Sequence, residues 1–287
     1  MDNKQRTSKS TIFSFCFLVF VICFLLWQIY LPRNSSLKEE LIFNIEKGDG
    51  SKDIAINLEK EGLIRFAPIF RIYVLTVGVS EKLQAGKYGL SPSMSIYQIT
   101  KKFASGDVAK KIVTIPKGFT VKEIEEKLNI TIDPNLEGFL FPDTYHFSYD
   151  AAPGEIVEIM RDNFEKKITK DLREEITRQN KTISEIITMA SLIEKEVKTR
   201  KDKDLVSGIL WKRLKIGMPL QVDSQMWTYE NRGLPPAPIC NPGLESIKSA
   251  VYPENSEYWY YLSTEEGRTI FSRTLEEHNA ARAKYLK

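Results

Sequence analysis

Two glutamates placed one residue apart are the side chains in this sequence whose setting suggests acid–base chemistry. They stand in "ASLIEKEVKTR", where an apolar run from Ile183 to Ile193 leads directly into Glu194 and Glu196. On a helix that turns 100° per residue, Glu194 falls inside the apolar stripe and Glu196 falls at its edge. Burial raises the pKa of a carboxyl group, and a raised pKa allows a glutamate to act as a general acid near neutral pH.

An ordinary structural role is the alternative for both carboxylates. Glu194 with Lys198, and Glu196 with Arg200, have the i,i+4 spacing of helix-surface ion pairs, each worth about 0.2–0.5 kcal/mol. The stretch taken alone favours this simpler interpretation, and helical periodicity taken alone selects Glu194 as the more buried of the two.

Composition excludes several classes of protein. The chain has 287 residues, with 41 Lys and Arg against 38 Asp and Glu and a net charge of +3. No dense basic patch appears, so no nucleic-acid partner is expected. The two histidines, His146 and His278, lie in unrelated contexts, and neither common glycine-rich phosphate motif occurs. We therefore expect no metal and no cofactor.

The N-terminal region has the composition of a membrane anchor. Residues 11–31 carry no charge and are long enough to cross about 30 Å of hydrocarbon as a helix. A cleaved signal peptide is the alternative, but no small-residue cleavage pattern follows. The basic residues of the tail, residues 1–10, predict a cytoplasmic N-terminus and a single-pass plasma-membrane protein whose bulk is extracytoplasmic. Cys240 is then the only cysteine outside the anchor, so no disulfide is expected within the exported part.

An internal repeat organises the exported region. "IEKGDGSKDIAINL" (45–58) and "IPKGFTVKEIEEKL" (115–128) share one frame, and residues 90–103 form a looser third copy. Each copy is typical of a strand, a turn and a short helix, and such small units are expected to pack on one another. The repeat either binds cell wall or is purely structural.

The remaining sequence predicts a helical domain closed by a hairpin. One helical stretch is expected over residues 153–178, followed by the helix of the two glutamates and another over residues 202–215. "NRGLPPAPICNPG" is too rich in Pro and Gly, and too long, for a simple turn and suggests a shaped binding loop. "EYWYYLST" and "RTIFSRT" predict a hairpin around "EEG", with a short helix from Leu275.

Motifs spread along the chain carry a resemblance to a known family. "FLFPDTY", "ASLIEKE", "RLKIGMPLQVD", "GLPPAPICNPG" and "FSRTLEEHN" occur in this order behind a single anchor. Together they resemble the YceG-like endolytic murein transglycosylase family over essentially the whole exported chain. The resemblance implies an α+β protein with a transmembrane helix (11–31), a LysM-like strand-turn-helix module (32–110) and a mixed α+β catalytic domain (111–287).

The resemblance also implies the reaction and its residues. It places the catalytic acid on the second glutamate of the pair, Glu196, and leaves Glu194 as a supporting residue. The expected reaction cleaves the β-1,4 bond from N-acetylmuramic acid to N-acetylglucosamine in nascent glycan strands without water. It leaves 1,6-anhydro ends and helps to terminate strand elongation. Gln221, Asp223 and Asn241 are candidates for positioning the sugar, with loop capping and turn formation as an equally weighted alternative.

One departure from the family keeps other functions open. The segment after "LQVD" is much shorter than is usual in the family, and Trp227 stands where its Y-N-T-Y motif has asparagine. A non-catalytic peptidoglycan-binding scaffold is therefore the alternative function. A true hydrolase, with Asp223 or Asp143 as a second carboxylate, also stays open. The expected partners are peptidoglycan strands and, by analogy alone, cell-wall synthesis complexes.

Overall fold

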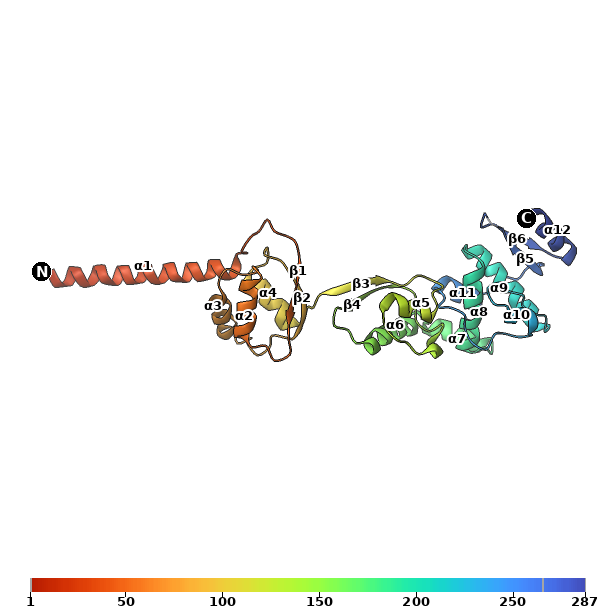
Figure 1. Ribbon diagram of the computed structural model, residues 1–287, viewed down its shortest axis with the longest axis horizontal. Helices are drawn as coiled ribbons and strands as arrows, with labels where there is room; N and C mark the ends of the chain where they lie inside the picture. The colour runs from red at the N-terminus through yellow and green to blue at the C-terminus, as the bar shows by residue number, and fades with distance from the viewer. Residues whose placement is uncertain (1, 265, 287) are drawn as a thin grey trace. The chain divides into compact units, whose positions relative to one another are not determined.

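The computed structural model of the protein describes residues 2–264 and 266–286. The chain divides into two compact units (Figure 1). Unit 1 comprises residues 1–111 and 146–150, and unit 2 comprises residues 112–145 and 151–287. Residues 146–150, which the sequence assigned to the catalytic domain, thus group with unit 1. Met1 of the expected tail, Glu265 of the expected hairpin turn and Lys287 lie outside the described residues.

Unit 1 is a small α+β unit behind a long apolar helix. Its elements, in chain order, are α1 (Asp2–Tyr30), β1 (Leu41–Ile45), α2 (Ser51–Lys60), α3 (Ala67–Thr76), β2 (Gly86–Leu90) and α4 (Ile96–Ser105). Strands β1 and β2 pair antiparallel, from Leu41 opposite Leu90 to Ile45 opposite Gly86. The helices and the inner faces of the strands enclose one apolar core, in which Leu58, Tyr88 and Phe103 are fully buried.

The first and third repeat copies account for much of this unit. The first copy forms the end of β1, a turn and α2, and the third copy forms the end of β2 and α4. Ser95 caps α4 through a reciprocal capping box with Gln98. The second copy belongs to unit 2, where it supplies α5 (Val121–Leu128). The expectation that all three copies pack together is therefore wrong, because only two of them share a core.

Helix α1 contains one segment that could cross a membrane. Among the described residues, Phe13–Tyr30 has a mean hydropathy of 2.3, with most of its side chains exposed. The end of α1 is attached to the rest of unit 1 by Arg65. Its guanidinium lies 4.9 Å from the centre of the Trp27 ring and donates a 2.7 Å hydrogen bond to the Pro32 carbonyl oxygen. Length and apolarity support a span, although a signal sequence would have the same properties.

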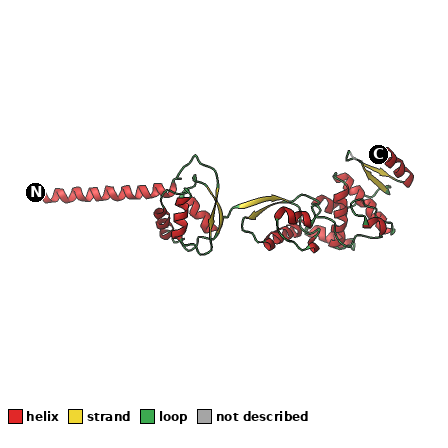
Figure 2. Cartoon of the chain, in the orientation of Figure 1, coloured by secondary structure: helices red, strands yellow, loops and turns green. Residues whose placement is uncertain are grey.

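Unit 2 is mainly helical, with short strands (Figure 2). The pair β3 (Lys110–Thr114) and β4 (Thr144–Ser148) carries the chain across the boundary between the two units. The other elements, besides α5, are η1 (Pro134–Leu136), α6 (Pro153–Lys167), α7 (Lys170–Arg178), α8 (Ile183–Glu196), α9 (Arg200–Lys215), α10 (Trp227–Glu230), α11 (Leu244–Val251), β5 (Tyr260–Ser263), β6 (Thr269–Ser272) and α12 (Leu275–Tyr285). With unit 1, they confirm a mixed α+β protein with one N-terminal apolar helix.

Helix α8 is the central element of unit 2. It packs against α7, α9 and α11, and every side chain from Ile186 to Ile193 is buried (Figure 1). Thr182 starts the helix with a capping box to Glu185. The prediction that this helix is buried nearly all round is confirmed. A helix enclosed on all sides holds whatever its C-terminal residues carry in a fixed position.

The expected helical stretch over residues 153–178 is two helices. Helix α6 ends at Lys167, Ile168 leaves the helical conformation, and Thr169 caps α7 by accepting a hydrogen bond from the Leu172 N–H. Ile168 is 1% exposed, so the break inserts an apolar side chain into the core. The apolar periodicity did not reveal this break, because Ile168 is buried at the break just as it would be in one continuous helix.

The C-terminal hairpin and helix form where the sequence predicts them. Strands β5 and β6 pair antiparallel, from Tyr260 opposite Ser272 to Ser263 opposite Thr269, and α12 packs against both. Thr274 caps α12 by accepting a hydrogen bond from the Glu277 N–H. This arrangement gives unit 2 a helical body with a small β-hairpin and helix beside it.

Candidate active site

A cavity at the C-terminal end of α8 contains one of the two glutamates. Its volume is about 680 Å³. Its walls come from the end of α8 (Glu196), from α9 (Arg213), from the segment 221–229, from β5 (Tyr260, Tyr261) and from α12 (His278, Asn279, Arg282). All of these elements belong to unit 2. The volume is that of a site for a ligand the size of a sugar.

The segment "LQVD" faces the cavity with alternate residues. Leu220 and Val222 are fully buried, whereas Gln221 and Asp223 line the cavity. Gln221 has a positive φ of 52°, a conformation that costs a residue other than glycine free energy and is often found at functional sites.

Thr228 holds this segment in shape. Its buried hydroxyl accepts a 2.8 Å hydrogen bond from the Val222 N–H, and its carbonyl oxygen accepts one of 3.1 Å from the Gln221 N–H. The short helix α10 therefore folds back onto "LQVD" and brings Tyr229 to the cavity wall. The shortened loop is well bonded internally.

Arg213 links two walls of the cavity from beneath. It is 3% exposed, and its Nη1 donates a 2.7 Å hydrogen bond to the Leu220 carbonyl oxygen. Its Nε and Nη2 donate bonds of 2.9 and 2.7 Å to the Trp259 carbonyl oxygen. One guanidinium thus fixes the start of the "LQVD" segment relative to the start of β5.

Glu196 presents its carboxylate to the cavity, held at both oxygens. Oε1 accepts a 3.2 Å hydrogen bond from the Ser224 N–H, and Oε2 accepts one of 3.3 Å from the Tyr261 hydroxyl. Burial raises the pKa of Glu196, and the Asp223 carboxylate adds to the rise, while the bonds from Ser224 and Tyr261 oppose it. Glu196 is also the last residue of α8, where the negative end of the helix dipole disfavours a carboxylate. The site therefore favours a protonated Glu196 more than water does.

Glu194 lies in a closed environment of its own. Its Oε1 accepts a 2.9 Å bond from Lys203 Nζ, and the two side chains are only 9% and 3% exposed. Oε2 accepts bonds of 2.9 Å from the Gly243 N–H and 2.7 Å from the Ser246 hydroxyl. Burial raises the pKa of Glu194, but the bonds from Ser246, Lys203 and Gly243 outweigh it and bring the pKa below its usual value. Glu194 is thus an ionised, fully partnered structural group.

The expected i,i+4 ion pairs are wrong. Helix α8 ends at Glu196, and Val197 is extended, with φ −139° and ψ 150°. Lys198 and Arg200 therefore lie beyond the helix and are not above the two glutamates. Glu194 pairs with Lys203 instead, and Arg200 pairs with Asp204 at 3.0 Å.

Asn241 lies outside the group of residues that line the cavity. It is fully buried, and its Oδ1 accepts a 2.8 Å bond from the Leu140 N–H. Its Nδ2 donates bonds of 3.0 Å to the Phe119 carbonyl oxygen and to Glu137 Oε1. Every hydrogen-bonding atom of the amide is engaged with protein, which supports the loop-fixing interpretation over the sugar-contacting one.

Sequence reasoning missed several cavity residues. Tyr229, Tyr261 and His278 line the cavity but were not candidates. His278 belongs to the quoted motif "FSRTLEEHN", so that motif already contained the signal. Tyr229 stands where the Y-N-T-Y motif has its last tyrosine, so that alignment contained a signal, whereas Tyr261 carried none within the tyrosine-rich stretch 258–261. Asp143, the other carboxylate considered for a hydrolase, is instead bonded to Asn163 at 3.1 Å and to Lys167 at 3.2 Å.

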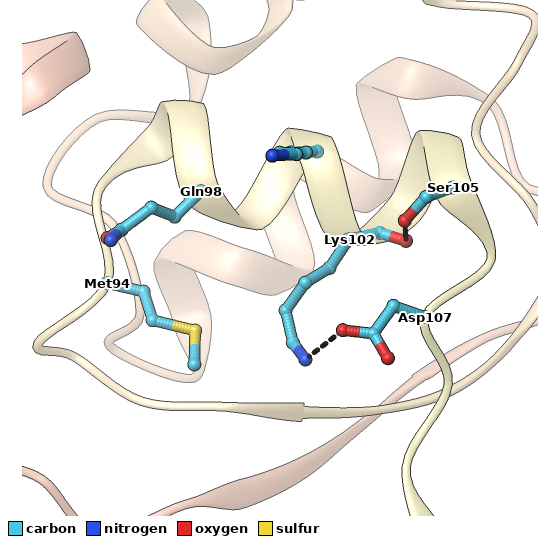
Figure 3. A pocket seen from close by; sticks show the side chains of 6 residues that line it. Met94, Gln98, Lys102, Ser105 and Asp107 are labelled. Carbon is cyan, nitrogen blue, oxygen red and sulfur yellow. Dashed lines mark hydrogen bonds and ion pairs between the residues drawn. The ribbon is translucent and has the colours of Figure 1, made fainter.

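A second hollow lies on α4 of unit 1 (Figure 3). Its carboxylate, Asp107, forms a 2.8 Å ion pair with Lys102. Because this carboxylate is exposed and already paired, the hollow lacks a group suited to acid–base work. Among residues 2–264 and 266–286, no cluster of His, Cys, Asp or Glu side chains is arranged to hold a metal ion. Acid–base chemistry by carboxylates is what the arrangement around Glu196 provides.

Comparison with known protein families shows the family to which the chain belongs. The profile of the YceG-like family matches residues 43–227 and 224–284, so the chain belongs to the YceG-like family. The two matched segments meet within the shortened segment after "LQVD".

Curated relatives and a solved structure agree with this family. An endolytic murein transglycosylase of Bacillus subtilis is 29% identical and covers 89% of this chain and 87% of its own. One from Streptococcus pneumoniae is 24% identical over 89% of this chain and 60% of its own length. The crystal structure of a yceG-like protein from Listeria monocytogenes is 31% identical, covers 85% of this chain and 99% of its own, and superposes with a TM-score of 0.55.

Proposed function

We propose that this protein is an endolytic lytic transglycosylase that cleaves peptidoglycan with Glu196 as its acid. The carrying observation is a partly buried carboxyl group with a raised pKa, fixed at both oxygens, on the wall of a cavity of about 680 Å³. The relatives named endolytic murein transglycosylases add the substrate, murein glycan, and the transglycosylase reaction. The bond to be broken is the β-1,4 bond from N-acetylmuramic acid to N-acetylglucosamine, inside nascent strands.

One carboxyl group suffices for this reaction. Glu196 donates its proton to the glycosidic oxygen as the bond from the anomeric carbon breaks, and the sugar's own acetamido group holds that carbon. The resulting carboxylate then accepts the proton of the C6 hydroxyl, whose oxygen closes the 1,6-anhydro ring. Glu196 returns to its protonated state, and no water is consumed.

Other polar groups of the cavity orient the strand. Gln221 and Asp223 face the cavity from the segment fixed by Thr228 and Arg213, and they are proposed to hold the amides and hydroxyls of the sugar. Asn241 is assigned a supporting part, because its amide ties residues 119 and 137–140 to the loop that precedes α11.

The N-terminal part is proposed to hold the enzyme at its substrate. The apolar segment of α1 spans the plasma membrane once, with a cytoplasmic N-terminus and an extracytoplasmic unit 2. Unit 1 is proposed to be a LysM-like wall-binding module, which two strand-turn-helix copies on one shared core support. Release of nascent strands at this place makes wall-synthesis complexes natural partners.

A hydrolase is the second candidate, because Asp223 lines the same cavity as Glu196. A second carboxylate on the opposite face of the sugar could activate water. A silent scaffold, suggested by the shortened loop, is the third.

The mass of the products separates these functions. Purified uncrosslinked glycan strands are incubated with the protein, and the released ends are analysed by mass spectrometry. A transglycosylase gives 1,6-anhydro ends, a hydrolase gives reducing ends heavier by one water, and a scaffold gives no cleavage. Hydrolysed ends or intact strands would overturn the proposal.

A further inference from the structure

Asp223 and Tyr229 form a hydrogen-bonded pair on the wall of the cavity that holds Glu196. The Tyr229 hydroxyl donates a hydrogen bond to Asp223 Oδ1. Both residues belong to the segment that Thr228 locks onto itself. The steps assigned to Glu196 require neither member of the pair, so the pair is available for a separate task.

Tyr229 keeps its proton at neutral pH. Burial raises the pKa of Tyr229 to about 12, and the hydrogen bond to Asp223 and the charges of Asp223 and Glu196 contribute to the rise. The tyrosine therefore acts as a donor that aims the Asp223 carboxylate. The pair presents to the cavity a carboxylate with one oxygen held and a second oxygen with which to accept a hydrogen bond.

The proposed reaction creates a need for such a carboxylate. When the glycosidic oxygen takes the proton of Glu196, the acetamido carbonyl oxygen forms a bond to the anomeric carbon as the glycosidic bond breaks. The intermediate is a cyclic oxazolinium ion, whose positive charge is shared with the nitrogen that bears its N–H. A preorganised carboxylate that accepts this N–H stabilises charge that is absent from the ground state, which accelerates the step.

In the second half of the reaction, the positive charge that the carboxylate stabilises is lost again. Glu196 takes the proton of the C6 hydroxyl, the C6 oxygen bonds to the anomeric carbon, and the bond to the acetamido oxygen breaks. The neutral acetamido group is restored, and the charge next to Asp223 disappears. Atoms and protons balance without any further reactant.

We infer that Asp223 is the catalytic residue that accepts the acetamido N–H of the N-acetylmuramic acid unit at the cleaved bond, and that Tyr229 is its positioning residue. The inference rests on the proposed function, because it names the protein group that stabilises the internal nucleophile. Asp223 would otherwise serve as a base for water. The Tyr229 hydroxyl donates to one oxygen of this carboxylate and fixes its orientation, as a charge stabiliser requires.

A stable analogue of the oxazolinium tests the inference by binding alone. The probe is a thiazoline made from N-acetylmuramic acid, in which sulfur replaces the oxygen of the five-membered oxazoline ring and the nitrogen, once protonated, carries the N–H of the oxazolinium. The reference ligand is an uncyclised disaccharide of N-acetylmuramic acid and N-acetylglucosamine. Calorimetric titration of the full-length protein compares wild type with Asp223→Ala and Tyr229→Phe. Asp162→Ala, exposed on α6, and Tyr252→Phe, 49% exposed, are the matched controls.

We expect Asp223→Ala to weaken thiazoline binding by about 10²–10³-fold, the usual loss when one preorganised electrostatic group is removed. Binding of the uncyclised disaccharide should weaken much less, because Asp223 holds its acetamido group but meets no positive charge there, and Tyr229→Phe should show a smaller loss of thiazoline binding. Equal losses for both ligands, or unchanged thiazoline binding, would overturn the inference. So would reducing ends made by wild type and lost in Asp223→Ala, because Asp223 would then be a base for water. A wild type that binds the thiazoline selectively but cuts no glycan would instead refute the proposed function.

Discussion

Glu194 and Glu196 leave the same helix two residues apart and enter opposite environments. Glu194 lies beside the start of α11, where a lysine, a hydroxyl and a backbone N–H neutralise it. Glu196 lies at the end of α8 and faces a cavity shared with a second carboxylate. Both are desolvated, yet the pKa of Glu194 falls and that of Glu196 rises.

The difference teaches that burial alone does not identify an acid. Desolvation raises the pKa of both groups, and the number of donors to each carboxylate decides the net direction. The positive end of one helix lies near Glu194, whereas Glu196 stands at the negative end of another. The carboxyl group proposed as the acid is the one to which the protein supplies fewer hydrogen-bond donors.

Glu196→Gln gives the largest expected contrast. The amide keeps the shape of the carboxyl group but cannot donate and recover a proton, so kcat should fall by about 10²–10⁴-fold. Release of anhydro ends from glycan strands measures the loss. Glu158→Gln, exposed on α6, is the control. Near-normal turnover by Glu196→Gln, together with loss of turnover in Glu194→Gln, would mean that Glu194 and not Glu196 is the acid.

Glu194→Gln should act on stability. It leaves the Lys203 charge buried without its partner, and such a change costs about 3–5 kcal/mol of unfolding free energy. Adding Lys203→Met should restore much of the loss, because the unpaired charge is then removed. Denaturant unfolding of the single and double variants checks this. An unchanged free energy of unfolding in Glu194→Gln would mean that the Glu194–Lys203 pair does not stabilise the fold.

Asn241→Ala and Gln221→Ala compare how the loss of a buried side-chain amide and of an exposed one affects stability and turnover. Asn241→Ala leaves the Leu140 N–H without its acceptor, at a cost of about 1–3 kcal/mol, so the melting temperature should drop. Gln221→Ala lies on the cavity wall and should reduce turnover with a stability change within about 0.5 kcal/mol. The contrary pattern, a stable Asn241→Ala with impaired turnover, would return Asn241 to the sugar-contacting group.

The pH dependence of stability should have opposite signs at the two glutamates, and this is the smallest expected effect. The pKa of Glu194 is lowered on folding, so its contribution is present above the unfolded value of about 4.3 and is lost as pH falls through the folded pKa. The pKa of Glu196 is raised on folding, so its ionised form lowers stability once pH exceeds the folded pKa. Glu196→Gln should therefore be slightly more stable than wild type at neutral pH, whereas the Glu194→Gln difference should vanish in acid. Unfolding measured from acid to neutral pH tests both signs.

The raised pKa of Glu196 also predicts that the rate of cleavage declines as pH rises through that pKa. Glu196→Gln should lack this decline.

The local patterns of the sequence were sufficient for the fold of most elements. The buried character of α8, the closing hairpin and α12 follow from periodicity and capping residues, which act within a few residues. The break at Ile168 was not visible, because a β-branched residue continues the apolar pattern in either conformation. The place of the second repeat copy was also not visible, since partner choice depends on distant contacts.

The candidate site was predictable in part. The position of "LQVD" beside Glu196 follows its motif order, and Gln221 and Asp223 do line the cavity. The partner of Glu194 was misjudged because the end of the helix at Glu196 could not be located from periodicity. The buried position of Asn241 could not be predicted, because an asparagine in a Pro-Gly loop has the same sequence context whether its amide faces a ligand or the core.

Cys240 gives the region beneath the site a chemical reporter. The thiol is fully buried and donates a 3.4 Å hydrogen bond to the Ser191 carbonyl oxygen on α8. Burial raises the pKa of Cys240 to about 12, so the folded protein holds almost no reactive thiolate at neutral pH. Alkylating reagents can therefore modify Cys240 only after the loop before α11 has separated from α8. The labelling rate of this one thiol, in a protein with Cys16 and Cys23 replaced by serine, would report how often the support of Glu194 and Glu196 transiently opens.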